Sequence, residues 1–221
     1  MPAIDLPESA ALLDALASVA ELLRDDEVAG RWNDPSTVER YSVGGVAGHL
    51  CQACERLVDV LDAPAPDGEP LLDLSAWFGQ NRVASDADLD ESIATWLRET
   101  GEAKAQVGAA ALADTLNSLT TTIAERLAVE RVERTVVSVR TPTRPIPLVD
   151  YVASRVVEVV IHGDDVAHAA GVAWEPPPGA AALASEFLLR MARDRSGDLA
   201  VLRALARAER VDDPADVLRG L

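Results

Sequence analysis

The sequence has 221 residues, of which 48% are hydrophobic and only 4% aromatic. These values suit one large domain, or a domain with an appendage, whose helices pack through aliphatic side chains. The formal net charge is −17, and because so acidic a surface repels nucleic acid and anionic membranes, both are excluded as expected partners.

Helical periodicity dominates the first part of the chain. Apolar residues recur at helical spacing over about residues 6–25, 43–62 and 89–127, with Gly108 as the candidate break in the last stretch. The connections between these stretches, "GRWNDPSTVERYS" and "APAPDGEPLLDLSAWFGQN", are rich in turn-forming residues. The sequence therefore predicts two long helices followed by a long helical region.

The second part begins with a change of pattern. The segment "RTVVSVRTPTRPIPL" alternates β-branched and polar residues, which predicts one short strand or extended arm. A helix then begins near Leu148 and ends before "WEPPPG", and two further helices fit residues 179–194 and 198–209. We expect an all-α protein: a four-helix-bundle domain over residues 1–175 and a short C-terminal helical extension over 176–221.

The start of the chain is acidic and has no basic segment, so it is not expected to be a signal peptide. No apolar run approaches the roughly 20 residues that span a bilayer, and two cysteines do not make a disulfide framework. We expect a cytoplasmic location. Lys104 is the only lysine among many arginines, which indicates a GC-rich genome.

The stretch "RVVEVVIHGDDVAHAAG" (155–171) places charged residues among valines and alanines. At about 100° per residue, Asp164 and His168 point away from the face that the other polar residues share. The residues on that shared face are Arg155, Glu158, His162 and Asp165. Glu158 and His162 stand four residues apart, on adjacent turns, and such a pair can bind one divalent ion. A purely structural Glu–His contact is the alternative.

A metal site needs a further ligand. Of the three histidines in the sequence, His49 is the remaining candidate, because His168 points away from the shared face. It lies mid-helix in "VAGHLCQAC", among small residues that allow another helix to approach closely. The alternative is a hydrogen-bonded core histidine. Cys51 and Cys54 lie on the opposite side of this helix from His49, so we interpret them as small buried side chains. A metal-binding or redox role for the two cysteines is the alternative.

These residues resemble a known family. "RWNDPSTVERYSVGGVAGHL" is similar to the N-terminal block of the mycothiol-dependent maleylpyruvate isomerase-like proteins, in the DinB-like four-helix-bundle superfamily. "YVASRVVEVVIHGDDVAHAAG" resembles the second block of that family, and "RSGDLAVLRALARAER" resembles a C-terminal segment found in many members. The isomerases themselves carry a further C-terminal domain, where this chain has a short helical tail.

The resemblance implies a divalent metal, usually zinc, held by His49, Glu158 and His162. Arg155 and Asp165 match the positions that flank the ligands, where they would support the ligands or face the substrate. The resemblance also implies mycothiol, a small thiol of actinobacteria, as co-substrate. Arg82, in "FGQNRVASD", is a weaker substrate-binding candidate, with a plain surface arginine as the alternative.

Three protein ligands leave a zinc ion open to another group, and an open zinc can hold a thiol as thiolate. The expected function is therefore a metal- and thiol-dependent transferase or isomerase, which acts on a small electrophile through a metal-bound thiolate. The alternatives are a non-catalytic metal-binding helical module, a helical bundle in which the metal has only a structural role, and a metal-dependent hydrolase. The expected partners are the thiol and the electrophile, and a homodimer is an open alternative to a monomer.

Overall fold

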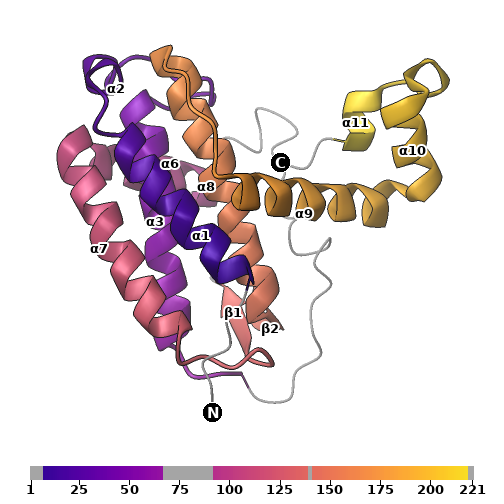
Figure 1. Cartoon of the computed structure of the whole chain (residues 1–221), viewed down its shortest axis with the longest axis horizontal. Helices are drawn as coiled ribbons and strands as arrows, with labels where there is room; N and C mark the ends of the chain where they lie inside the picture. The colour runs from indigo at the N-terminus through magenta and orange to yellow at the C-terminus, as the bar shows by residue number, and fades with distance from the viewer. Residues whose placement is uncertain (1–6, 67–91, 139–140, 219–221) are drawn as a thin grey trace.

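The computed structural model describes residues 7–66, 92–138 and 141–218. Within them, helices follow one another with a single small sheet in between (Figure 1). The elements in chain order are α1 (Pro7–Leu22), α2 (Asp26–Gly30), α3 (Val43–Asp62), α6 (Ser92–Ala105), α7 (Ala109–Leu127), β1 (Thr135–Ser138), β2 (Thr141–Pro147), α8 (Leu148–Ala170), α9 (Pro178–Ser196), α10 (Asp198–Ala206), the 3-10 helix η1 (Ala208–Arg210) and α11 (Pro214–Leu218). The all-α prediction is confirmed.

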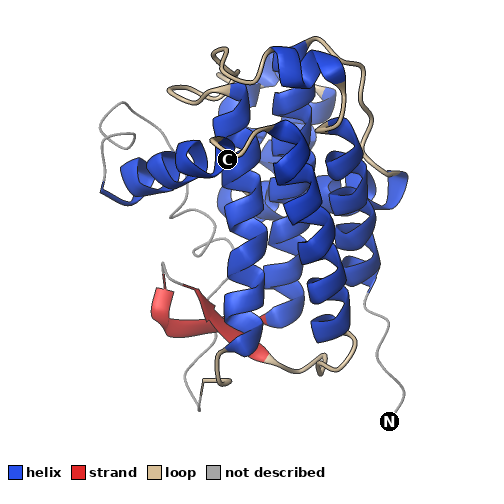
Figure 2. Ribbon diagram, turned by 90° about the vertical axis from the view of Figure 1, so that its left-hand side faces the viewer, coloured by secondary structure: helices blue, strands red, loops and turns tan. Residues whose placement is uncertain are grey.

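Four long helices, α1, α3, α7 and α8, lie side by side and form the bundle (Figures 1 and 2). α1 packs against α7 and α8, and α3 packs against α7 and α8 on the other side. α6 packs along α3 from outside this group of four. The core between the helices is aliphatic, as the composition predicted, and its fully buried side chains include Leu12, Leu16, Leu50, Leu57, Leu116 and Ile123.

α3 and α8 run in opposite directions, and Arg134 links the end of one to the start of the other. The backbone oxygen of Arg134 accepts a hydrogen bond from the first residue of α8, Leu148, at 2.8 Å. Its guanidinium donates to the oxygen of Ala63, which follows the last turn of α3, also at 2.8 Å. This contact satisfies a carbonyl that the helix end leaves without an intrahelical donor.

The approach of α6 to α3 depends on two glycines. A Cβ atom added to Gly48 of α3 would lie 2.1 Å from the backbone oxygen of Gly101 in α6. An added Cβ on Gly101 would in turn lie 2.7 Å from the oxygen of Gly45. Because those neighbours are backbone atoms, neither helix can accept a larger side chain there without moving. The small residues around His49 thus serve the close helix approach that the sequence predicted.

The break predicted at Gly108 is confirmed: α6 and α7 are separate helices, and the turn between them contains Gly108 with a φ of 86°, which favours glycine. Other observed elements differ from the predicted ones. The single predicted strand is a two-stranded antiparallel hairpin, with prolines in its second strand. The last predicted helix, 198–209, is α10 followed by a separate 3-10 turn.

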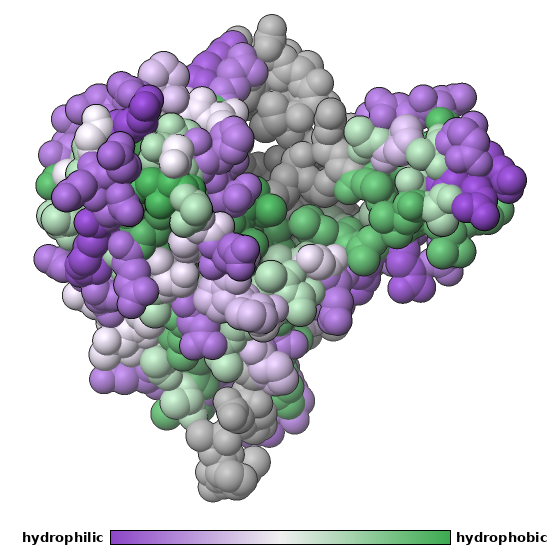
Figure 3. Space-filling model, turned by 45° about the horizontal axis from the view of Figure 1, so that its top comes forward, coloured by the Kyte–Doolittle hydropathy of each residue, from purple (hydrophilic) through white to green (hydrophobic). Residues whose placement is uncertain are grey.

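α9 packs against α8 and α1, whereas α10 and α11 pack on α9 away from the bundle (Figure 1). Hydrophobic residues remain visible on this C-terminal part in the space-filling view (Figure 3). In α10, Leu199, Leu202 and Leu205 are each about 60% exposed. The division into domains at residues 175 and 176 stays a prediction. Among the described residues, no helix has the length and apolar character needed to cross a membrane.

Candidate metal centre

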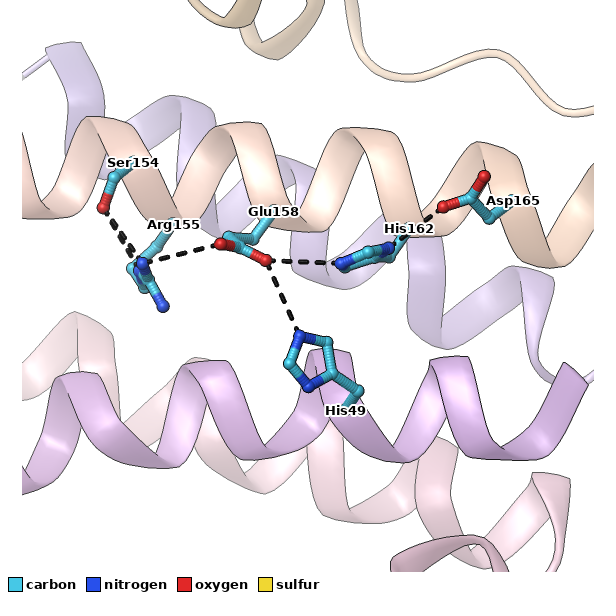
Figure 4. A network of polar contacts seen from close by, with 6 residues as sticks. All are labelled: His49, Ser154, Arg155, Glu158, His162 and Asp165. Atoms are coloured by element: carbon cyan, nitrogen blue, oxygen red, sulfur yellow. Dashed lines mark hydrogen bonds and ion pairs between the residues drawn. The ribbon is translucent and has the colours of Figure 1, made fainter. Parts of the chain in front are cut away.

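α8 carries most of the polar residues of the candidate site. It begins directly after the prolines of β2 and ends at Gly171, whose φ of 73° is the left-handed conformation that favours glycine. Its valines and alanines are buried against α1, α3 and α9, while one stripe presents its polar side chains toward α3. Figure 4 shows Arg155, Glu158, His162 and Asp165 along this stripe. Asp164 and His168 are exposed on another side of the helix.

His49 reaches this stripe from the middle of α3 (Figure 4). Its Nε2 lies 3.9 Å from Oε2 of Glu158, and Nε2 of His162 lies 3.3 Å from the same oxygen. One donor atom from each of the three residues lies within 4.8 Å of the other two. The structure thus brings together the three residues that the sequence analysis proposed as metal ligands. That they bind a metal stays a prediction.

The three donors fit a divalent ion of the zinc type. Imidazole nitrogens and a carboxylate oxygen are the ligands that zinc accepts, each at about 2 Å from the ion. Donor atoms placed so would be about 3 to 4 Å apart, close to the spacings between Glu158 and each histidine. The side chains are 15–19% exposed, so they are in contact with solvent. Within the described part of the chain, this is the one such cluster of three or more His, Cys, Asp or Glu residues.

The charges of the cluster are already those that metal binding requires, except at His162. Burial, together with the charge of His162, lowers the pKa of His49 to about 4, so His49 is neutral at pH 7. Burial also raises the pKa of Glu158, but the hydrogen bond with His162 and the charge of Arg155 outweigh burial and hold that pKa well below its usual range. Glu158 is therefore a carboxylate.

His162 is held in place by hydrogen bonds. Its Nδ1 lies 3.0 Å from Oδ2 of Asp165, which directs Nε2 toward Glu158. Burial lowers the pKa of His162, but the bonds with Asp165 and Glu158 outweigh burial and raise it to about 9. Thr37, in the connection before α3, donates a hydrogen bond to the other oxygen of Asp165 at 3.1 Å. Thr37 was not among the predicted site residues, because no periodic pattern links a loop residue to a helix 128 positions away.

Arg155 lies one turn before Glu158 and is 7% exposed. Its guanidinium lies 3.8 Å from Oε1 of Glu158, donates to the hydroxyl of Ser154, and stacks over the ring of Tyr151 at 4.9 Å. The buried cation thus has the carboxylate as a nearby counter-charge, as the shared stripe predicted. Because Arg155 stabilises the ionised form of Glu158, it keeps that side chain available as a metal ligand.

The two cysteines take no part in the cluster. Cys51 and Cys54 are buried free thiols in α3, and burial raises the pKa of Cys51 to about 12 and that of Cys54 further still. Thiols that stay protonated at neutral pH are poor nucleophiles and poor ligands. Arg82, the weaker substrate-binding candidate, lies outside the described residues.

The fold and the cluster define a helical-bundle protein with a candidate centre of two histidines and one glutamate between α3 and α8. The family model described as "Mycothiol maleylpyruvate isomerase N-terminal domain" matches residues 9–167, a range that includes all three residues of the cluster. The chain belongs to this family. No curated protein and no solved structure gives a significant match.

Proposed function

We propose that this protein is a metal- and thiol-dependent transferase or isomerase that acts on a small electrophile. The observation that carries the proposal is the convergence of His49, Glu158 and His162 from two helices, with side chains that keep some exposure to solvent. The family supplies the thiol, since its description names mycothiol. Zinc is the metal that suits the donors, although iron, cobalt and nickel accept similar ligands.

Three protein ligands would leave a coordination position open, the arrangement of catalytic zinc rather than of closed structural zinc. When bound, the metal would hold the thiol as a thiolate near neutral pH. In an isomerisation, the sulfur adds to one carbon of a conjugated cis double bond, the resulting single bond rotates, and the C–S bond breaks again. In a transfer, the sulfur displaces a leaving group and stays on the product.

The residues around the ligands support this chemistry in different ways. Asp165 accepts the hydrogen bond of His162 Nδ1, which orients the ring so that Nε2 faces the centre. Arg155 holds Glu158 in its charged form. Hydrolysis would need a general base to activate water, whereas Glu158 would serve as a ligand and Asp165 is already bonded to His162 and Thr37.

The test is a comparison of metal-loaded protein given a panel of electrophiles with mycothiol, with glutathione and with no thiol. Turnover that requires mycothiol, and that His162→Ala abolishes, is the expected result. Turnover without any thiol would make the protein a hydrolase instead. Tight metal binding with neither turnover nor thiol binding would make it a non-catalytic metal-binding module.

A further inference from the structure

His49 lacks the kind of contact that orients His162. Nδ1 of His162 faces the carboxylate of Asp165, whereas Nδ1 of His49 is buried and has no hydrogen-bond partner among the described residues. A histidine that binds a metal through one nitrogen usually donates the other to a partner, and that bond fixes the orientation of the ring. The ring of His49 must therefore be held by a contact of another kind.

Tyr41 provides a contact with the ring of His49. The centroids of the two rings are 5.9 Å apart and their planes meet at 61°, an edge-to-face arrangement. The ring of His49 is in turn 5.1 Å from that of His162, with the planes at 80°. Rings at such distances attract one another and favour particular mutual orientations. Tyr41 thus contacts a candidate ligand without belonging to α3 or α8.

The loop that carries Tyr41, in the connection between α2 and α3, is held by its own hydrogen bonds. Pro35 and Ser42 form an isolated antiparallel bridge, and the backbone N–H of Ser36 donates to the oxygen of Tyr41 at 2.9 Å. Between them, the hydroxyl of Thr37 donates to Asp165 on α8. One loop therefore contacts His49 through Tyr41 and, through Thr37, the carboxylate that orients His162.

Arg40, directly before Tyr41, has a φ of 66°. Within the described part of the chain it is the one residue other than glycine with a positive φ. This left-handed conformation is unfavourable for a residue with a Cβ atom, and strained residues of this kind cluster at functional sites. At Arg40 it belongs to a tight turn, which the N–H of Tyr41 closes by donating to the oxygen of Val38 at 3.1 Å. The chain leaves this turn with Tyr41 against His49.

We propose that Tyr41 is a positioning residue of the candidate centre, which holds the imidazole of His49 ready for the metal, and that the left-handed conformation of Arg40 directs Tyr41 to this place. The inference rests on the proposed function for the metal itself. Tyr41 would do for His49 by ring contact what Asp165 does for His162 by a hydrogen bond. The ring, and not the hydroxyl, is the part of Tyr41 that this role requires.

The first experiment needs no metal. NMR spectra of metal-free protein with 15N-labelled histidine rings report the surroundings of His49, whose signals are identified by their loss in His49→Ala. Tyr41→Ala should shift these signals, because the ring current of Tyr41 is removed, whereas Tyr41→Phe should keep them nearly unchanged. Arg40→Val and Arg40→Gly are a matched pair, since both remove the guanidinium but glycine alone accepts a positive φ freely. Arg40→Val should therefore shift the His49 signals and Arg40→Gly should not.

The second experiment measures zinc affinity by competition with a chelator and ligand geometry by the visible spectrum of the cobalt-loaded protein. Tyr41→Ala should bind zinc about three- to ten-fold more weakly, the equivalent of one aromatic contact, and should change the cobalt spectrum. Tyr41→Phe should restore both properties. Arg40→Val should resemble Tyr41→Ala, and Arg40→Gly should resemble the unmodified protein. Circular dichroism shows that each variant is folded.

Equal zinc affinity and equal cobalt spectra of Tyr41→Ala and the unmodified protein would overturn the positioning role, even where Tyr41→Ala is less stable, and would leave the proposed function standing. Equal His49 signals in Arg40→Val and Arg40→Gly would overturn the part assigned to Arg40. If the unmodified protein binds neither zinc nor cobalt, the proposed function is wrong, while the spectra of the metal-free variants still decide whether Tyr41 holds the ring of His49.

Discussion

Asp165 offers the sharpest test of how the candidate centre is held together. Its carboxylate lies between Thr37 and His162, with one oxygen accepting from the Thr37 hydroxyl at 3.1 Å and the other facing His162 Nδ1 at 3.0 Å. In the neutral ring that would bind a metal, the second contact favours the tautomer with the proton on Nδ1 and the lone pair on Nε2. Replacing Asp165 with alanine removes this constraint while leaving all three metal ligands in the chain.

The expected loss can be estimated from the role of such contacts in metal sites. Removing the carboxylate that orients a ligating histidine lowers metal affinity by about 10- to 100-fold, which corresponds to about 1.4 to 2.8 kcal/mol. Asp165→Asn keeps an oxygen that can accept from Nδ1 but loses the negative charge, so its loss should be at the lower end of this range. Thr37→Val removes only the bond to Asp165 and should cost a few-fold in affinity, since one such bond contributes about 1 kcal/mol.

The assay is a zinc competition titration against a chromophoric chelator, with the visible spectrum of the cobalt-loaded protein as a second measurement of ligand geometry. Asp164→Ala is the matched control, because Asp164 is the neighbouring carboxylate and is exposed on another side of α8. The expected order of affinity is unmodified protein and Asp164→Ala, then Thr37→Val, then Asp165→Asn, then Asp165→Ala. Identical affinities for the two alanine variants would refute the role assigned to Asp165.

Three further predictions concern the ligand set, the protonation of His162 and the contact between α3 and α6. Replacing Cys51 and Cys54 together with alanine should leave the zinc content unchanged, whereas His49→Ala or His162→Ala should remove most of it. Metal analysis of the purified variants measures the zinc content, and the reverse pattern would contradict the proposed ligand set. Zinc binding at pH 7 should release about one proton from the ligands, because the pKa of His162 is raised to about 9 while His49 is already neutral and Glu158 already ionised. Calorimetry in buffers of different ionisation enthalpy counts the protons, and none released would contradict a protonated His162. Gly48→Ala should lower the free energy of unfolding, measured by urea denaturation, by about 1 to 3 kcal/mol through overpacking against Gly101. The control is Gly179→Ala, which should not destabilise the protein because a Cβ atom added there has no neighbour within 4 Å.

The helices that carry the candidate ligands could be predicted from the sequence because their signals are local. α3 begins after Ser42, whose hydroxyl accepts a hydrogen bond from the backbone N–H of Gly45, and it occupies the predicted residues 43–62. α8 begins where the prolines of β2 end, at the predicted Leu148. On a regular helix, spacing alone determines which residues share a face, so the stripe from Arg155 to Asp165 was also predictable.

The contacts between distant segments could not be predicted in this way. The carboxylate of Glu102, in α6, accepts hydrogen bonds from both the backbone N–H and the hydroxyl of Ser42 at the start of α3. The bond between Thr37 and Asp165 similarly joins a loop to the opposite helix. Such pairs depend on how the helices are arranged in space, which the spacing of residues along the chain does not give. The hairpin was mistaken for one strand because the prolines of β2 disfavour a ladder position away from a sheet edge.

The two histidines of the candidate centre are positioned by different means, and the difference gives α6 a part in the site. His162 is oriented by Asp165, whereas Nδ1 of His49 is buried and makes no hydrogen bond within the described part of the chain. His49 is instead positioned by packing: a Cβ added to Gly101 of α6 would lie 3.3 Å from the Cβ of His49 and 3.1 Å from its backbone nitrogen. A change in the spacing of α3 and α6 would therefore move His49 relative to Glu158 and His162, which are both fixed on α8. For this reason we expect metal affinity to depend on the glycine contact between α3 and α6, although α6 contributes none of the three candidate ligands.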